Sequence, residues 1–106
     1  MKQIVLGTGG ELSVYAVPDA VAEELEGYCL KFLAWMENNV RAQKFLILGG
    51  LKYTAEDFTD YLNTRVFPKE NSVFVEKLGR IPVGESLPAP YTDCPVYRFR
   101  EGENRV

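Results

Sequence analysis

The sequence contains no histidine. Without it, the usual Ser-His-Asp and Cys-His nucleophiles cannot be built, and neither can histidine acid–base or metal sites. Carboxylate pairs remain, such as Asp57 and Asp60 on one predicted helix face, but this spacing is typical of a solvated acidic surface. We therefore predict no catalytic residue and no cofactor, and keep a small enzyme only as an alternative.

Cysteine is almost absent as well, because Cys29 and Cys94 are the only two. Their wide separation excludes a disulfide framework and the close pairs of a zinc site, so we predict no metal. Cys29 falls on the apolar stripe of a predicted helix and is expected to be buried and inert. Cys94 follows Asp93, whose charge raises the thiol pKa and opposes thiolate formation. We interpret both as free thiols in a reducing cytoplasm.

Basic clusters and long apolar runs are also lacking. The chain has 12 Lys and Arg residues against 15 Asp and Glu residues, a net charge of -3, which disfavours nucleic acid and anionic lipid as partners. No apolar run approaches the roughly 20 residues that span a bilayer. The apolar run near Met1 ends at the first glycines and is too short for the hydrophobic part of an export signal. We expect a soluble protein with no membrane partner.

What is present is the composition of an ordinary folded protein, with 46% hydrophobic and 25% charged residues. A length of 106 residues predicts a single domain over residues 1–106. Short β-branched stretches at residues 2–6 and 12–17 flank a glycine-rich turn. This pattern predicts a β-hairpin.

Two helices follow in the predicted order. Apolar residues recur at helical spacing from Asp19, the predicted N-cap, to about Asn39. The apolar stretch at residues 44–48 predicts a short buried strand. A second helix is predicted from near Thr54, in an approximate capping box, and ends before Pro68.

Residues 72–78 and 96–100 are predicted to be strands, which we expect to pair with each other. Residues 101–106 are predicted to be a frayed tail. The order is therefore β-β-α-β-α-β-β. It predicts an α+β fold with two layers, a mostly antiparallel sheet with the helices on one face.

Several of these features resemble ubiquitin-like β-grasp domains. They are the glycine-turned hairpin, a proline before a long helix, the FLILGG stretch and the KENSVFVEK strand, all within residues 1–75. The resemblance is one of layout, and it implies a β-grasp variant with a C-terminal extension as the alternative fold. The chain departs from the family in its longer second helix, its residues from Gly79 onward and its lack of a terminal diglycine. Conjugation chemistry of the ubiquitin kind is therefore not implied.

The most distinctive segment is a loop at residues 79–95, which holds four of the six prolines. Compact domains seldom carry an irregular connection longer than roughly 12 to 15 residues unless it binds something or is disordered. Proline lowers the entropy lost when a loop is ordered, and tyrosine offers an amphipathic anchor. We therefore predict a partner-binding surface on this loop and its flanks. Its residues are Pro88, Pro90, Tyr91, Asp93, Tyr97, Arg80, Arg98 and Arg100.

From these features we predict a small non-catalytic module that binds a protein partner through residues 79–97, as a regulator or inhibitor of a larger complex. One alternative is an enzyme, or an enzyme subunit, that uses loop carboxylates, tyrosines or Cys94. Another is a homodimer or larger homo-oligomer that packs loop aromatics across a symmetry axis. A third is a single-stranded nucleic-acid binder using the VYRFR strand, where Tyr97 and Phe99 alternate with arginines. Arginines on an edge strand equally deter aggregation.

Overall fold

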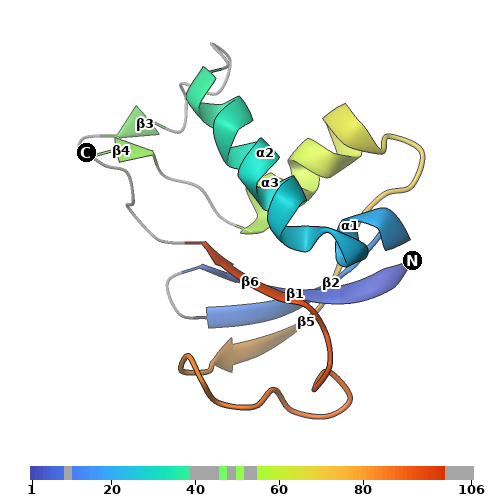
Figure 1. Cartoon of the computed structure of the whole chain (residues 1–106), viewed down its shortest axis with the longest axis vertical. Coiled ribbons are helices and arrows are strands. Elements are labelled where there is room, and N and C mark those ends of the chain that lie inside the picture. The colour runs from blue at the N-terminus through green and yellow to red at the C-terminus, as the bar shows by residue number, and fades with distance from the viewer. Residues whose placement is uncertain (9–10, 39–45, 48–49, 52–54, 100–106) are drawn as a thin grey trace.

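The computed structural model describes residues 1–8, 11–38, 46–47, 50–51 and 55–99 (Figure 1). Its strands are β1 (Lys2–Thr8), β2 (Glu11–Val17), β3 (Leu46–Ile47), β4 (Gly50–Leu51), β5 (Val73–Arg80) and β6 (Val96–Phe99). Its helices are α1 (Asp19–Glu23), α2 (Leu25–Asn38) and α3 (Ala55–Tyr61), and the π-helical segment η2 (Leu62–Val66) continues α3. A mixed sheet with helices packed against it confirms the predicted α+β class.

The main sheet has four strands in the order β5-β2-β1-β6. The hairpin strands β1 and β2 are antiparallel, β5 runs antiparallel to β2, and β6 runs parallel to β1. β5 and β6 therefore lie at opposite edges, and the expected pairing between them is wrong. The hairpin separates them because each of its two outer edges takes one of these strands.

The hairpin divides its side chains between two cores. Ile4 pairs with Tyr15 in the register, and both face the helices, whereas Val5 pairs with Val14 and both face the other side. This alternation is the period-two pattern that the sequence predicts for a strand. Because both faces are apolar, both must be covered if the apolar surface is to be removed from water.

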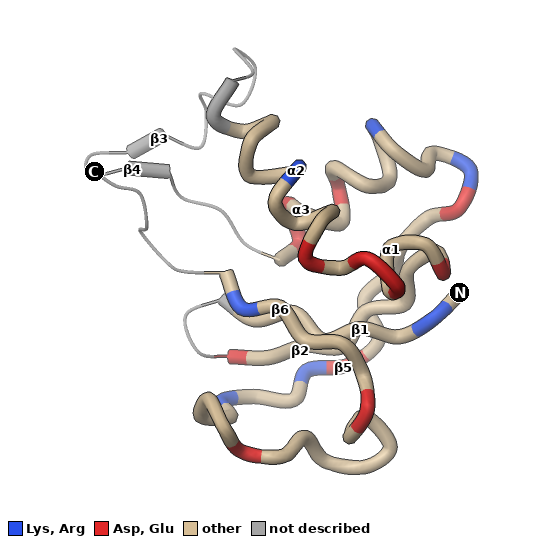
Figure 2. Tube along the Cα trace, viewed as in Figure 1, with Lys and Arg blue, Asp and Glu red and all other residues tan. Residues whose placement is uncertain are grey.

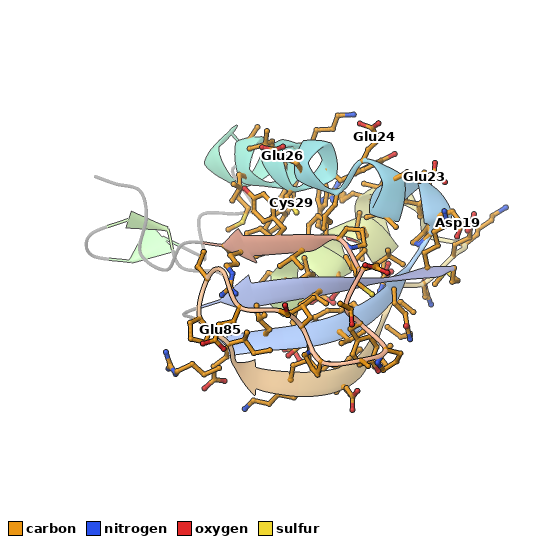
Figure 3. All side chains as sticks on the ribbon, turned by 60° about the horizontal axis from the view of Figure 1, so that its bottom comes forward. Asp19, Glu23, Glu24, Glu26, Cys29 and Glu85 are labelled. Atoms are coloured by element: carbon orange, nitrogen blue, oxygen red, sulfur yellow. The ribbon has the colours of Figure 1, made fainter. Side chains whose placement is uncertain are left out.

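Helices cover one face of the sheet (Figure 1). The predicted stripe on the first helix is buried, with Phe32 and Cys29 both 0% exposed, and Cys29 lies between α2 and the sheet (Figure 3). Phe32 is the centre of an aromatic cluster, with ring centroids 5.5 Å from Phe58 and 5.9 Å from Phe99. Edge-to-face pairs of this kind add stability beyond the area they bury.

The first predicted helix is divided in two at Glu24, whose φ of -130° and ψ of 46° are not helical. The predicted capping role of Asp19 is also wrong. Pro18 is the N-cap of α1 and provides no side-chain cap, while the Asp19 carboxylate pairs with the amino group of Met1 at 3.1 Å. Acidic residues gather on α1 and at the start of α2 (Figure 2). A second ion pair there joins Lys2 to Glu23 at 3.2 Å.

The strand predicted at residues 44–48 is only partly described. Residues 46–47 form β3, which pairs with β4 in a separate two-stranded sheet. The prediction had placed this strand in the single main sheet. Residues 44–45 and 48, the predicted capping residue Thr54 and the predicted tail at residues 101–106 lie outside the described residues.

Residues 81–95 cover the second face of the sheet, opposite the helices (Figure 1). Leu12 and Tyr91 are buried in this second core, with Val5 and Val14 beside them. Leu87 from the loop is among the half-buried residues packed against it. The loop therefore forms a third layer on a sheet that was predicted to have helices on one face only. Its length follows from the strand order, because the chain must cross the whole sheet to pass from β5 to β6.

Candidate functional site

The predicted binding residues of the loop fall into two groups in the structure. The first group is turned inward: Tyr91 is only 7% exposed, and interaction with the Glu76 side chain raises the pKa of its hydroxyl. Tyr97 is half-buried against the helix-side core, and the Arg98 guanidinium donates to the Ile81 carbonyl at 2.9 Å. These three side chains make packing or hydrogen-bond contacts within the fold. The expected surface position of Tyr91 is therefore corrected, since a turn from Pro88 directs it into the second core.

The second group is exposed on the outside of the loop and at its start. Pro88, Pro90, Asp93 and Arg80 are all exposed, while Arg100 lies outside the described residues. The loop also carries Val83, whose side chain is 81% exposed beside the positive-φ residue Gly84. Binding of a partner by these residues stays a prediction.

Both cysteines are free thiols, one in each core region. Burial raises the pKa of Cys29 strongly, and the nearby charge of Glu26 raises it further. The pKa of half-buried Cys94 is raised by burial first and by Asp93 second. Because the thiolate is the nucleophile, both environments disfavour thiol reactivity near neutral pH.

The edge strand β5 is a feature that the sequence reasoning missed. Its outer side carries no strand within the described part of the chain. Three consecutive apolar residues near its start are exposed, at 52% for Val73, 54% for Phe74 and 37% for Val75. The register with β2 is irregular opposite Val75 and again near Leu78, which marks two bulges. The sequence SVFVEKL shows the apolar run, but only the strand order shows that it lies at an edge.

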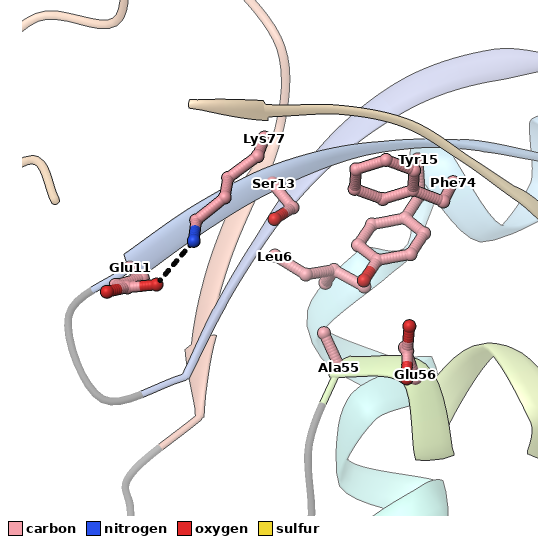
Figure 4. Close-up of a pocket in the computed structure, with 8 residues that line it drawn as sticks. All are labelled: Leu6, Glu11, Ser13, Tyr15, Ala55, Glu56, Phe74 and Lys77. Atoms are coloured by element: carbon pink, nitrogen blue, oxygen red, sulfur yellow. Dashed lines mark ion pairs between the residues drawn. The ribbon is translucent and has the colours of Figure 1, made fainter. Parts of the chain in front are cut away.

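A groove of about 280 Å³ lies beside β5 on the helix face of the sheet (Figure 4). Its walls come from β1, β2, β5 and the start of α3. They are Leu6, Glu11, Ser13, Tyr15, Ala55, Glu56, Phe74 and Lys77.

The groove has a charged end and an aromatic end (Figure 4). At the charged end, the Lys77 ammonium pairs with the Glu11 carboxylate at 3.3 Å. At the aromatic end, the rings of Tyr15 and Phe74 meet edge to face with centroids 5.7 Å apart. Burial raises the pKa of Tyr15, and the negative charge of Glu56 raises it further, so the Glu56 carboxylate acts on the Tyr15 hydroxyl. Within the described residues, Glu56 forms no ion pair.

The described residues contain no group of three or more side chains suited to hold a metal ion. In the same part of the chain, no helix has both the length and the apolar character needed to cross a membrane. No protein family model, no curated protein and no solved structure matches this chain.

Proposed function

We propose that this protein is a non-catalytic interaction domain that binds an extended segment of a partner protein along the outer edge of β5. The observation that carries the proposal is the exposed apolar run of Val73, Phe74 and Val75 on that edge. An extended segment can add a strand to such an edge, gaining backbone hydrogen bonds along it and side-chain contacts beside it.

The character of this edge supports the proposal. Natural sheets protect exposed edges with short strands, charges, prolines or bulges, because free backbone groups pair with other chains. β5 has eight residues, and its two bulges and its charges fall from Val75 onward. Val73 and Phe74 precede these protective features, so the apolar start of the strand is the least protected part of the edge.

The test is a binding selection with a library of random dodecapeptides displayed on phage. Peptides that bind the wild-type protein are then measured against Val73→Lys, which places a charge on the edge. Leu30→Lys is the matched control, because Leu30 on α2 is also 52% exposed and the charge change is the same. We expect Val73→Lys to weaken binding at least about tenfold and Leu30→Lys to leave it unchanged. If the selected peptides bind Val73→Lys and the wild-type protein with equal affinity, binding at the β5 edge is rejected.

The outer rim of the loop is a second candidate surface for the same function. Among the residues that the structure describes, Val83 is the most exposed large apolar residue, and exposed Pro88, Pro90 and Asp93 belong to the same loop. Selected peptides that lose affinity for Val83→Lys but not for Val73→Lys would locate binding on this rim. A regulator or inhibitor of a larger complex would use either surface in the same way, by contact without chemistry.

We further propose a β-grasp-like layout for the first part of the chain and a reducing, cytoplasmic location. The hairpin followed by the helices supports the layout, although β5 lies at an edge beside β2 and β6 pairs with β1. The two free thiols, Cys29 and Cys94, support the location, because oxidising compartments favour disulfides. Mass spectrometry of the protein from its native cell, with and without prior reduction, would test the second point.

A further inference from the structure

We infer that the segment bound by β5 carries an arginine or lysine whose side chain enters the groove beside the strand and pairs with Glu56. This inference rests on the proposed function, since the cation is delivered by the bound strand. Pairing along the edge requires only an extended backbone in the partner. The groove adds a requirement for a basic side chain at one position of that segment.

The charges of the groove favour a cation. It contains two carboxylates, Glu11 and Glu56, and one ammonium group, that of Lys77. Glu11 and Lys77 compensate each other at 3.3 Å, which leaves the charge of Glu56 without a partner among the described residues. The whole chain has a net charge of -3, which favours the approach of a basic segment.

The aromatic wall favours a cation as well. Phe74 and Tyr15 present ring surface and edge to the same groove, and a guanidinium or ammonium group is attracted to an aromatic face. The protein already uses this contact elsewhere, since Arg65 lies 5.6 Å from the Trp35 ring and Lys31 lies 5.4 Å from the Tyr28 ring. The apolar stem of a basic side chain would pack along Leu6 and the rings.

The strand register explains how the side chain would arrive. Phe74 is paired with Tyr15 and Lys77 with Ser13, so these two β5 residues face the groove. A residue placed opposite Phe74 on an added antiparallel strand would have its Cβ about 5 Å away and on the same face. A long basic side chain at that position extends over the Phe74 ring toward Glu56.

Other side chains fit the groove less well. An acidic side chain would meet the charge of Glu56, and like charges in close contact repel. An apolar side chain would contact the rings but leave the exposed Glu56 carboxylate paired only with water. A basic side chain gains both the ring contact and a modest ion pair.

The experiment uses the same phage library of random dodecapeptides and reads the sequences that are selected. We expect one position to be enriched in arginine or lysine, two residues from an apolar position on the same face. Replacing that basic residue with norleucine should weaken binding to the wild-type protein by about fivefold to tenfold. Glu56→Gln should weaken binding of the basic peptide to a similar extent and leave the norleucine peptide unaffected. Glu85→Gln, which removes an exposed loop carboxylate, is the control and should change neither affinity.

The outcomes separate the inference from the function on which it rests. Peptides that need the β5 edge but show no basic position, or bind Glu56→Gln and wild type equally, would overturn the cation inference and leave the proposed function standing. If no selected peptide is weakened by Val73→Lys, both are rejected. A loss of basic-peptide affinity with Glu85→Gln equal to that with Glu56→Gln would also overturn the inference, because general charge would then explain the binding.

Discussion

The Tyr91 hydroxyl interacts with the Glu76 side chain, which raises its pKa, and so joins the proline-rich loop to the edge strand β5. The same tyrosine is buried beside Leu12 and Val14. Tyr91 therefore attaches the loop to the sheet in two ways. Its hydroxyl interacts with Glu76 on the edge strand, and its ring packs in the second core. This relationship makes the loop a structural layer and leaves the outer edge of β5 as the main candidate for binding.

The first prediction concerns this attachment. Tyr91→Phe removes the hydroxyl that interacts with Glu76 and keeps the ring, whereas Tyr91→Ala removes both. We expect both variants to lower the free energy of unfolding in urea, with the alanine variant losing clearly more, because a large buried side chain contributes more than one hydrogen bond. Asp93→Ala, at an exposed position in the same loop, is the control and should be close to neutral. Wild-type stability for Tyr91→Ala would show that the loop is not a structural layer.

The second prediction concerns the close approach of the hairpin strands at Gly7. A Cβ atom at this position would overlap the Cδ2 atom of the fully buried Leu12 and come within 3.3 Å of the Glu11 carbonyl oxygen. Gly7→Ala should therefore lower the free energy of unfolding by about 1–3 kcal/mol. Gly27→Ala is the matched control, since a Cβ there meets nothing within 4 Å. Because Gly27 lies inside α2, its substitution should raise stability by about 0.5–1 kcal/mol. Equal effects of the two would contradict the close approach.

The third prediction concerns Asn63, which binds the backbone just before β5. Its side-chain amide donates to the Ser72 carbonyl at 3.0 Å, and its side-chain oxygen accepts from the Ser72 amide at 2.6 Å. Asn63→Ala leaves both backbone groups unpaired and should cost about 1–3 kcal/mol of unfolding free energy, measured in urea. The neighbouring Thr64→Ala removes one exposed hydrogen bond, to the Asp60 carbonyl, and should stay within about 0.5 kcal/mol of wild type.

The fourth prediction is a loss of stability in alkali. The pKa of Cys29 is raised in the folded protein, and so are the pKa values of Tyr15 and Tyr61. A group whose folded pKa is raised stabilises the protein fully below its unfolded pKa and loses this effect as pH rises toward the folded value. The free energy of unfolding should therefore fall above about pH 9, by up to about 1.4 kcal/mol per pH unit for the buried Cys29 thiol and by less for the two partly exposed tyrosines. Cys29→Ala should flatten the first part of this fall, and an unchanged slope would contradict the burial of the thiol.

Local patterns in the sequence were enough to predict the hairpin and the apolar stripe on the first helix. Period-two and helical periodicity are properties of neighbouring residues, so they are visible without tertiary structure. The alternation in VYRFR also placed Tyr97 and Phe99 on a common face of the strand, which the structure shows to be the face packed against the helix-side core. The break at Glu24 was not predicted, because the apolar spacing continues through it.

The position of the candidate surface at β5 could not be predicted in the same way. The run at Val73, Phe74 and Val75 was predicted only as part of a strand, and it is the strand order that places this strand at an exposed edge. Likewise, the sequence predicts Tyr91 as a surface anchor. In the structure β6 pairs with β1, so the loop crosses the second face of the sheet and Tyr91 is buried there. Both differences come from long-range pairing, which no local pattern contains.

Amide hydrogen exchange of the protein, alone and saturated with a dodecapeptide selected from the phage library, tests strand addition at β5 most directly. An added strand would pair with the backbone amides of residues 73–80 that point away from β2, beginning at the exposed run from Val73 to Val75. We predict that exchange of these amides slows at least about tenfold on binding, while the loop at residues 81–95 is unchanged. Protection confined to the loop, or no protection of β5 in a saturated complex, would contradict binding at this edge.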